Sequence, residues 1–332
     1  MKIILMVLSI IGLMFGEGKI SGVTYFDFSA TNTKSAFNFH RQYFGYSGEV
    51  SDQVSYKILF DVGRTNIGAA VIEKDTSYKS EDTRLIAFLK KAQVNYKSSF
   101  GKFNFGLIGM NTYGIQESNW GYRFIEQSAI DKYKFSATAD IGVGFSRSLI
   151  DDLNLSLLVV NGEGFKKPQG DKYHKIAFNT TYGENNLNKN NGYNAGVVYT
   201  MESTGTGPTT MASVFGGFAG MGLRLGGEYD MLTKAGGSEA NIISISANYG
   251  IRENLDVFVR IDMHDPDAKY TYDKETYAED DDKNKRSSNY IIAGIVLACN
   301  GGISVAPNIR MTTFENETEA LMEYKVNFQF KF

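Results

Sequence analysis

The sequence predicts an all-β protein, a transmembrane antiparallel β-barrel of about 16 strands. Successive segments alternate apolar and polar residues, which is the period-two pattern of a strand with one apolar face and one face toward water. Aromatic residues make up 13% of the chain, yet the mean hydropathy is -0.24. Beyond the N-terminus no segment has the length and apolarity of a membrane-spanning helix. A chain that crosses a bilayer without such helices must satisfy its backbone hydrogen bonds between strands.

The C-terminal end shows the alternation most clearly. Every second residue from 322 to the terminus is apolar or aromatic, and the residues between them are polar: Met322, Tyr324, Val326, Phe328, Phe330 and Phe332. Ending a chain on an exposed Phe is unusual for a soluble sheet. It is typical of a strand whose outer face meets lipid and whose inner face meets water.

The N-terminus predicts an exported protein. Lys2 is followed by an apolar run, residues 3–15, which only Ser9 and Gly12 interrupt, and Gly16 and Gly18 supply small residues for cleavage. We therefore expect a signal peptide over residues 1–18 and a single barrel domain over residues 19–332. A membrane anchor is the alternative, but the run is shorter than the roughly 20 residues that a spanning helix needs.

The strands follow one another with no linker that would divide the chain into domains. In Phe37–Gly48, Arg41 shares a face with Phe39, which conflicts with simple alternation. Strand ends are uncertain by a few residues, so a count of 14 or 18 stays open. The predicted strands are Gly18–Ala30, Phe37–Gly48, Gln53–Arg64, Arg84–Lys97, Lys102–Thr112, Phe135–Arg147, Leu153–Gly162, Tyr173–Gly183, Gly192–Met201, Met211–Gly220, Met221–Leu232, Ala240–Gly250, Leu255–His264, Asn289–Cys299, Ile303–Phe314 and Ala320–Phe332.

The connections alternate between short and long, as a membrane barrel requires. Short turns, such as Asn300-Gly301-Gly302, are expected on the periplasmic side. With both termini on that side, the number of strands must be even. The predicted long loops are Thr65–Thr83, Tyr113–Lys134, Glu163–Lys172, Glu202–Thr210 and Asp265–Ser288.

The size of the barrel predicts a channel. About 16 strands enclose an aqueous lumen, whereas about eight leave room only for side chains. Many inward positions are polar, so we expect the lumen to be hydrated; they include Arg224, Glu228, Asp230, Ser244, Ser246, Asn248, Asp256, Arg260, Asp262, His264, Asn308, Arg310 and Thr312. The net charge of -3 gives no large positive field that would attract nucleic acid.

With its terminal aromatics, its layout of strands and the segment Asn161-Gly162-Glu163-Gly164, the chain resembles Gram-negative outer-membrane porins of the general and phosphate-selective type. The resemblance implies a place in the bacterial outer membrane, surrounded by its lipid, and a homotrimer. It also implies that Phe328, Phe330 and Phe332 are recognised by the barrel-assembly machinery. In that family the connection after the fifth strand folds into the barrel and narrows the channel.

Here that connection is Tyr113–Lys134, and we expect a short helix within Glu126–Lys134. A constriction acts by size and by the field between charges on the loop and on the wall. The candidates on the loop are Glu117, Trp120, Tyr122, Arg123, Glu126 and Asp131, and those on the wall are Arg41, Lys57, Arg84, Arg260 and Arg310. Whether Trp120 and Tyr122 contact solute or only pack on the wall stays open.

These features predict a water-filled channel for passive diffusion of small polar solutes and ions. Two alternatives stay open: a substrate-specific channel on the same fold, for an anion such as phosphate or for a sugar, and a structural or adhesion barrel. We expect no cofactor or metal, because His40, His174 and His264 show no metal-ligand spacing. We also expect no enzyme, because a barrel hydrolase would need a Ser and a His adjacent on the outer wall, and His264 is placed inward. The acidic run Glu279–Asp282 is expected to be solvated, since its spacing matches no calcium-binding loop.

Overall fold

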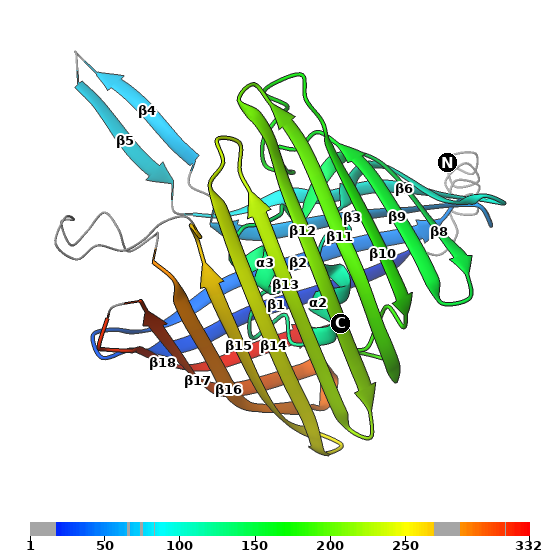
Figure 1. The fold of residues 1–332 in the computed structure, drawn as a ribbon. Helices are drawn as coiled ribbons and strands as arrows, with labels where there is room; N and C mark the ends of the chain where they lie inside the picture. The colour runs from blue at the N-terminus through cyan, green and yellow to red at the C-terminus, as the bar shows by residue number, and fades with distance from the viewer. Residues whose placement is uncertain (1–17, 65–66, 74–75, 83, 269–285, 316) are drawn as a thin grey trace, which may run out of the picture.

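The computed structural model shows a closed β-barrel (Figure 1). It describes residues 18–64, 67–73, 76–82, 84–268, 286–315 and 317–332. Of the expected signal peptide, residues 1–17 lie outside the described residues, and so does the acidic run Glu279–Asp282.

In the described part of the chain the barrel has 16 antiparallel strands, so the predicted fold class and strand number are confirmed. Neighbours in sequence are neighbours in the barrel, except that β3 pairs with β6, and β1 pairs with β18 to close the ring. The barrel strands are β1 (Lys19–Ala30), β2 (Ser35–Glu49), β3 (Val54–Arg64), β6 (Leu85–Ser98), β7 (Gly101–Gly109), β8 (Ala139–Ile150), β9 (Leu153–Val160), β10 (Lys175–Gly183), β11 (Gly192–Thr204), β12 (Gly207–Gly220), β13 (Leu223–Thr233), β14 (Glu239–Arg252), β15 (Leu255–Asp265), β16 (Ser288–Cys299), β17 (Ile303–Phe314) and β18 (Leu321–Lys331).

The seam between the first and last strands is held by backbone bonds and by aromatic packing. The amide of Phe332 donates to the carbonyl of Gly22 at 3.1 Å, and the amide of Gly22 donates back at 3.0 Å. The ring of Phe328 stacks on Phe26 with a centroid distance of 4.6 Å. Gly22 gives the terminal ring its space, because a Cβ there would overlap the side chain of Phe332. The terminal aromatics therefore lie at the point where the barrel closes.

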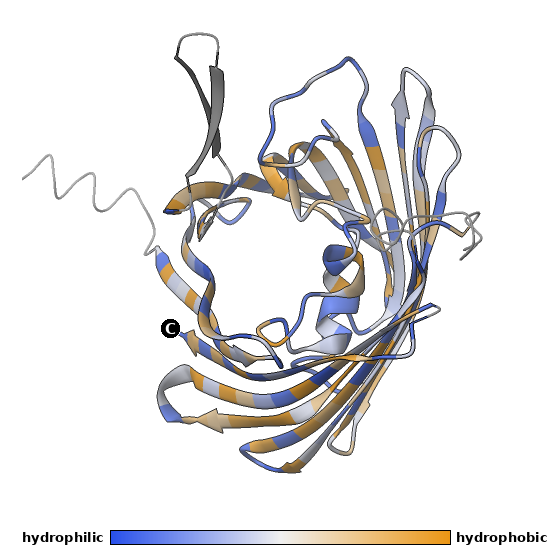
Figure 2. Cartoon of the chain, turned by 90° about the vertical axis from the view of Figure 1, so that its left-hand side faces the viewer, coloured by the Kyte–Doolittle hydropathy of each residue, from blue (hydrophilic) through white to orange (hydrophobic). Residues whose placement is uncertain are grey.

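Alternation places apolar side chains outside and polar ones inside. On β15, Val259 and Ile261 are exposed on the outer face, whereas Arg260 and Asp262 are buried inside. Figure 2 shows the resulting bands of apolar and polar residues along the strands. The outer face is thus an apolar belt of the kind that lipid covers.

Two β-bulges change the inner face of neighbouring strands. In β2 the pairing with β1 skips His40, so Phe39 stays outside while Arg41 lies inside, which resolves the conflict in the sequence pattern. In β6 the pairing with β3 skips Lys90, and the side chain of Lys90 is buried in the lumen. A bulge adds one residue to a strand and locally breaks the period of two. Both bulges therefore bring an additional basic or imidazole side chain inside.

Two of the predicted long loops differ from the structure. Thr65–Thr83 contains a separate two-stranded sheet, β4 (Ile67–Glu73) and β5 (Thr76–Asp82). Glu202–Thr210 is mostly strand, because β11 and β12 continue until Thr204 pairs with Gly207, and the hydroxyl of Thr204 donates to the Gly207 carbonyl at 2.6 Å. No helix among the described residues is long and apolar enough to cross a membrane.

A pair of arginine substitutions tests which face meets lipid. Ile58 is exposed on the outer face of β3, and Gln93 lies on the inner face of β6 beside Lys57, at a similar height. Ile58→Arg should cost more than its control, up to the roughly 2–4 kcal/mol that an arginine facing lipid costs at the bilayer midplane. Gln93→Arg, the matched control, should cost little because its guanidinium stays in water. Reversible unfolding in lipid vesicles measures both, and equal losses would show that the faces are assigned wrongly.

The seam generates a second prediction. Changing Phe328, Phe330 and Phe332 together to Ser removes the ring stacking at the closure and the aromatic end of β18. We expect a large loss of folded, heat-modifiable protein in the outer membrane. Tyr324→Ser, which removes an exposed aromatic from the far end of the same strand, is the control and should assemble normally. Normal assembly of the triple variant would contradict the expectation.

Candidate functional site: the infolded loop and the lumen wall

The connection between β7 and β8 enters the barrel, as Figures 1 and 2 show. It forms two short helices, α2 (Gly114–Trp120) and α3 (Ala129–Lys132). The helix α2 lies against β12 and β13, and α3 lies against β14. The expected helix within Glu126–Lys134 corresponds to α3, whereas α2 was not predicted. The predicted infolding of Tyr113–Lys134 is confirmed.

Gly121 ends α2 and lets the chain turn toward the wall. Its φ is 81°, a left-handed conformation that glycine adopts without strain, and its amide donates to the Glu117 carbonyl at 2.8 Å. A Cβ at this position would also overlap the guanidinium of Arg224. The turn thus brings the following residues, Tyr122–Gln127, onto the inner surface of the barrel.

Trp120 anchors the loop to the wall and lies away from open water. Its side chain is only 3% exposed and packs edge-on against Phe258, with a centroid distance of 5.7 Å. The indole N–H donates to the Glu126 carbonyl at 3.0 Å, and Asn248 donates to the Trp120 carbonyl at 2.9 Å. Tyr122 also packs on Phe258 and is buried. The structure therefore packs both rings on the wall.

Two arginines of the wall hold the loop by charge. Arg310 of β17 pairs with Glu126 at 3.0 Å and donates to the Ile125 carbonyl at 2.7 Å. Arg260 of β15 is 1% exposed and donates to the Gln127 carbonyl at 2.5 Å. Buried cations are stable only when their donors find partners. Carbonyls and a carboxylate of the loop provide those partners at three consecutive residues.

The same network shifts the pKa of Glu126. Burial by itself would raise this pKa, but Lys132, Arg310 and Arg260 stabilise the carboxylate and lower it to about 2. The Tyr290 hydroxyl also donates to the carboxylate, at 2.8 Å. Because the pKa lies below its ordinary value, the stability that this network adds is fully present at neutral pH. It is lost as the pH falls toward about 2.

Glu117, Arg123 and Asp131 are paired within the loop, whereas Lys132 lies 3.5 Å from Asp262 of the wall. Arg123 binds Glu117 at 2.9 Å through Nε and Asp131 at 3.0 Å through Nη2. The predicted arrangement had acidic residues of the loop facing basic residues of the wall. Glu126 does face Arg310 of the wall, whereas Glu117 and Asp131 pair with Arg123 of their own loop.

Beside the loop lies a cavity of about 360 Å³. It lies between the loop and strands β1, β2, β17 and β18, and its lining is largely charged. The residues around it are Tyr25, Asp27, His40, Arg41, Arg123, Phe124, Ile125, Glu126, Gln127, Arg310, Lys325 and Asn327. Of the predicted wall residues, Arg41 and Arg310 therefore lie here, whereas Arg260 lies beneath the loop.

The remaining two wall candidates lie elsewhere. Lys57 lines a separate cavity of about 460 Å³ at the short-turn end of the barrel, together with Lys19 and Glu49. Arg84 is exposed immediately before β6 begins. Sequence alternation alone placed these residues on strands but gave no information about their height in the barrel.

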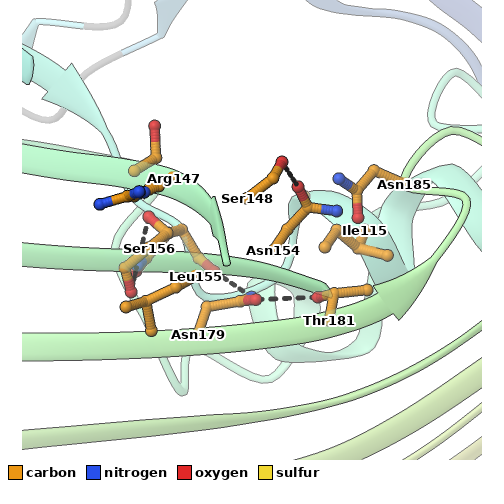
Figure 3. Close-up of a pocket in the computed structure, with 12 residues that line it drawn as sticks. Ile115, Arg147, Ser148, Asn154, Leu155, Ser156, Asn179, Thr181 and Asn185 are labelled. Carbon is orange, nitrogen blue, oxygen red and sulfur yellow. Dashed lines mark hydrogen bonds between the residues drawn. The ribbon is translucent and has the colours of Figure 1, made fainter. Parts of the chain in front are cut away.

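A further cavity, of about 390 Å³, lies between the start of the loop and β8, β9 and β10 (Figure 3). Its polar lining consists mostly of amides and hydroxyls that bond to one another. The side chain of Asn111 donates to the Ser156 hydroxyl at 3.0 Å, and the Thr181 hydroxyl donates to the side-chain oxygen Oδ1 of Asn179 at 2.9 Å. Across the described residues, no group of three or more His, Cys, Asp or Glu side chains is placed to hold a metal ion.

Comparison with known proteins places the fold. No protein-family model and no curated protein matches the sequence. Solved structures match along nearly the whole chain, at low identity. In vitro folded OmpT, an outer membrane protein of Vibrio cholerae, in its trimer form, is 11% identical with a TM-score of 0.62, covering 96% of this chain and 99% of the other. OmpF of Salmonella typhi is 10% identical with a TM-score of 0.62, covering 96% and 98%.

An anion-selective porin from Comamonas acidovorans gives a similar result. It is 9% identical with a TM-score of 0.60, and the match covers 95% of this chain and 99% of the other. At such identities the likeness establishes the fold alone. The chain thus has the fold of outer-membrane porins.

Trp120, the only tryptophan of the chain, reports on the anchoring of the loop. Glu126→Gln weakens the contact with Arg310, so at neutral pH we expect a red-shifted emission and stronger quenching by iodide. Wild-type emission should stay blue-shifted until the pH falls toward about 2, where Glu126 takes up its proton. Glu117→Gln, whose ion pair lies within the loop, is the control. Emission and quenching of Glu126→Gln at wild-type values would contradict this view of the anchor.

Proposed function

We propose that this protein is a porin of the bacterial outer membrane that lets small polar solutes and ions diffuse passively through a water-filled channel. The observation that carries the proposal is the position of the loop. It is anchored on one side of the lumen, against β12–β17, and a charged cavity lies between it and the opposite strands. The loop therefore narrows the lumen and leaves a polar passage.

The division between the two faces of the wall supports a membrane location. Outward side chains such as Ile245, Val259 and Ile261 are apolar and exposed. Inward side chains such as Asp27 and Asp61 are charged and buried within the barrel. Apolar groups outside and polar groups inside suit a barrel that separates lipid from water. The predicted signal peptide would export the chain to that membrane.

The remaining partners belong to the same proposal. Outer-membrane lipid would cover the apolar belt, and the barrel-assembly machinery would recognise Phe328, Phe330 and Phe332. The Vibrio cholerae structure is described as a trimer form, and we extend a homotrimer to this chain as a proposal.

Catalysis is not part of the proposal. Within the described residues, none of the three histidines forms a hydrogen bond with a Ser, Thr or Cys side chain: His40 binds Asp27 at 2.6 Å, and His264 stacks on Tyr133. An adhesion barrel would share the fold but would not need a charged passage past an anchored loop. Swelling of protein-containing liposomes in neutral solutes of increasing size separates a diffusion channel from such a barrel.

Shortening the loop tests whether it sets the width of the channel. Replacing Gln116–Arg123 by a short Gly-Ser turn removes most of α2 and the Trp120 anchor, so single-channel conductance in planar bilayers should rise. The control replaces the β13–β14 turn, Lys234–Ser238, in the same way, and it should leave conductance unchanged. Wild-type conductance in the loop variant would place the constriction elsewhere.

A further inference from the structure

More basic than acidic side chains line the cavity beside the loop, although the chain as a whole carries a net charge of -3. Four cationic side chains line the cavity beside the loop, namely Arg41, Arg123, Arg310 and Lys325, against two carboxylates, Asp27 and Glu126. The carboxylates that pair with Arg41 and Arg123, namely Asp61, Glu117 and Asp131, are not among the lining residues. The surface that the cavity presents to a solute is therefore mainly cationic, and cationic groups at such a surface attract anions.

The bulge in β6 extends this basic surface. It places Lys90 inside, where the ammonium group donates to the Tyr43 hydroxyl at 2.7 Å and lies 3.8 Å from Asp61. Arg41, which the bulge in β2 places inside, lies over the same tyrosine ring and pairs with Asp61 at 3.2 Å. Two cations thus share one carboxylate at this part of the wall.

The carboxylates that could attract cations are already paired. Asp27 accepts hydrogen bonds from Asn38 at 2.7 Å and His40 at 2.6 Å, and Lys325 lies 3.3 Å away. Glu126 is held by Arg310 and the Tyr290 hydroxyl. Pairing cancels much of their field at the cavity.

The guanidinium groups of Arg41 and Arg123 keep donor capacity toward the cavity. Arg41 uses Nε and Nη1, and Arg123 uses Nε and Nη2, so among the described residues Arg41 Nη2 and Arg123 Nη1 have no hydrogen-bond partner. Their side chains are 22% and 20% exposed, which leaves these nitrogens within reach of solvent. Arg310, by contrast, donates from Nε to Asn308 of the wall and from Nη1 and Nη2 to Glu126 and the Ile125 carbonyl of the loop.

We propose that Arg41 and Arg123 form an anion subsite in the channel, which contacts solutes that carry a carboxylate or phosphate group. This inference rests on the proposed channel function and adds its substrate class. One guanidinium comes from the wall and the other from the loop, and both line the same cavity. The N–H groups of a guanidinium match the oxygens of carboxylate and phosphate in geometry and charge. Carboxylates behind each group, Asp61 for Arg41 and Glu117 and Asp131 for Arg123, hold the pair in place.

Reversal potentials across a planar bilayer with a salt gradient test the proposal. The wild-type channel should prefer chloride to potassium, more strongly at low salt, because charges are screened less there. Arg41→Gln combined with Arg123→Gln should lower the anion-to-cation permeability ratio severalfold. Arg41→Lys combined with Arg123→Lys keeps both charges and should retain most of the preference. Lys34→Gln, an exposed cation in the β1–β2 turn, is the control and should change nothing.

Block of the chloride current identifies the ligand. Inorganic phosphate and acetate are added separately, and block by either one that weakens in the double Gln variant supports the subsite. If phosphate alone blocks the current, the subsite selects tetrahedral anions. If phosphate and acetate both block it, the subsite recognises the negative charge that these two anions have in common. Emission of Trp120 at the wild-type maximum shows that the loop of the Gln variant is still packed.

Two results overturn the inference while leaving the channel itself established: a conducting wild type that prefers potassium, and a double Gln variant with unchanged selectivity and unchanged block. A folded barrel that conducts nothing overturns the proposed channel function, and the anion subsite with it. Failure of the subsite and failure of the channel therefore give different readings in the same apparatus.

Discussion

The contact between two buried wall arginines and the loop is the interaction on which the rest of the lumen depends. Arg310 and Arg260 donate to the carbonyls of Ile125 and Gln127, and Arg310 also pairs with Glu126 between them. Removing one partner of a buried ion pair leaves an uncompensated charge, which is strongly unfavourable. The loop is therefore fixed on one side of the barrel, and its position decides where water can pass.

This anchoring divides the lumen into a packed half and a wet half. Beneath the loop, inward residues such as Met211, Ile242, Phe258 and Ile292 form buried apolar clusters with loop side chains. The expectation of a hydrated lumen therefore holds for the parts beside the loop, where cavities lie along β1, β2, β17 and β18 and along β8–β10, and not for the wall beneath the loop. Along β1, β2 and β6, the side chains that the two bulges turn inward, together with Lys325 and the guanidinium groups of Arg41 and Arg123, give the cavity its charge. One face of the loop thus packs on the apolar wall, and the other face presents Arg123 to the cavity.

Much of the fold could be predicted from sequence because period-two alternation is a local property. The strands of the barrel, their closure and the outward position of residues such as Val259 follow from it. The bulge in β2 left a signal, because Arg41 and Phe39 break the alternation there, whereas the bulge at Lys90 was not foreseen, since one inserted residue changes the pattern only once. The packed half did leave a signal: Tyr290–Ala298 is apolar at nearly every position, which means that both faces of β16 meet apolar surroundings. Which cations pair beneath the loop and which face water depends on contacts between residues far apart in the chain.

A double-mutant cycle on Glu126 and Arg310 tests the central contact most directly. The free energy of unfolding is measured for the wild type, Glu126→Gln, Arg310→Gln and the double variant, with quenching of Trp120 followed in parallel. Residues in direct contact typically show a coupling of about 0.5–3 kcal/mol. The account predicts a coupling in that range, with the double variant losing less than the sum of the single losses and Trp120 more accessible in all three. Additive losses and an unchanged Trp120 would show that the loop is held in the barrel by something other than this pair.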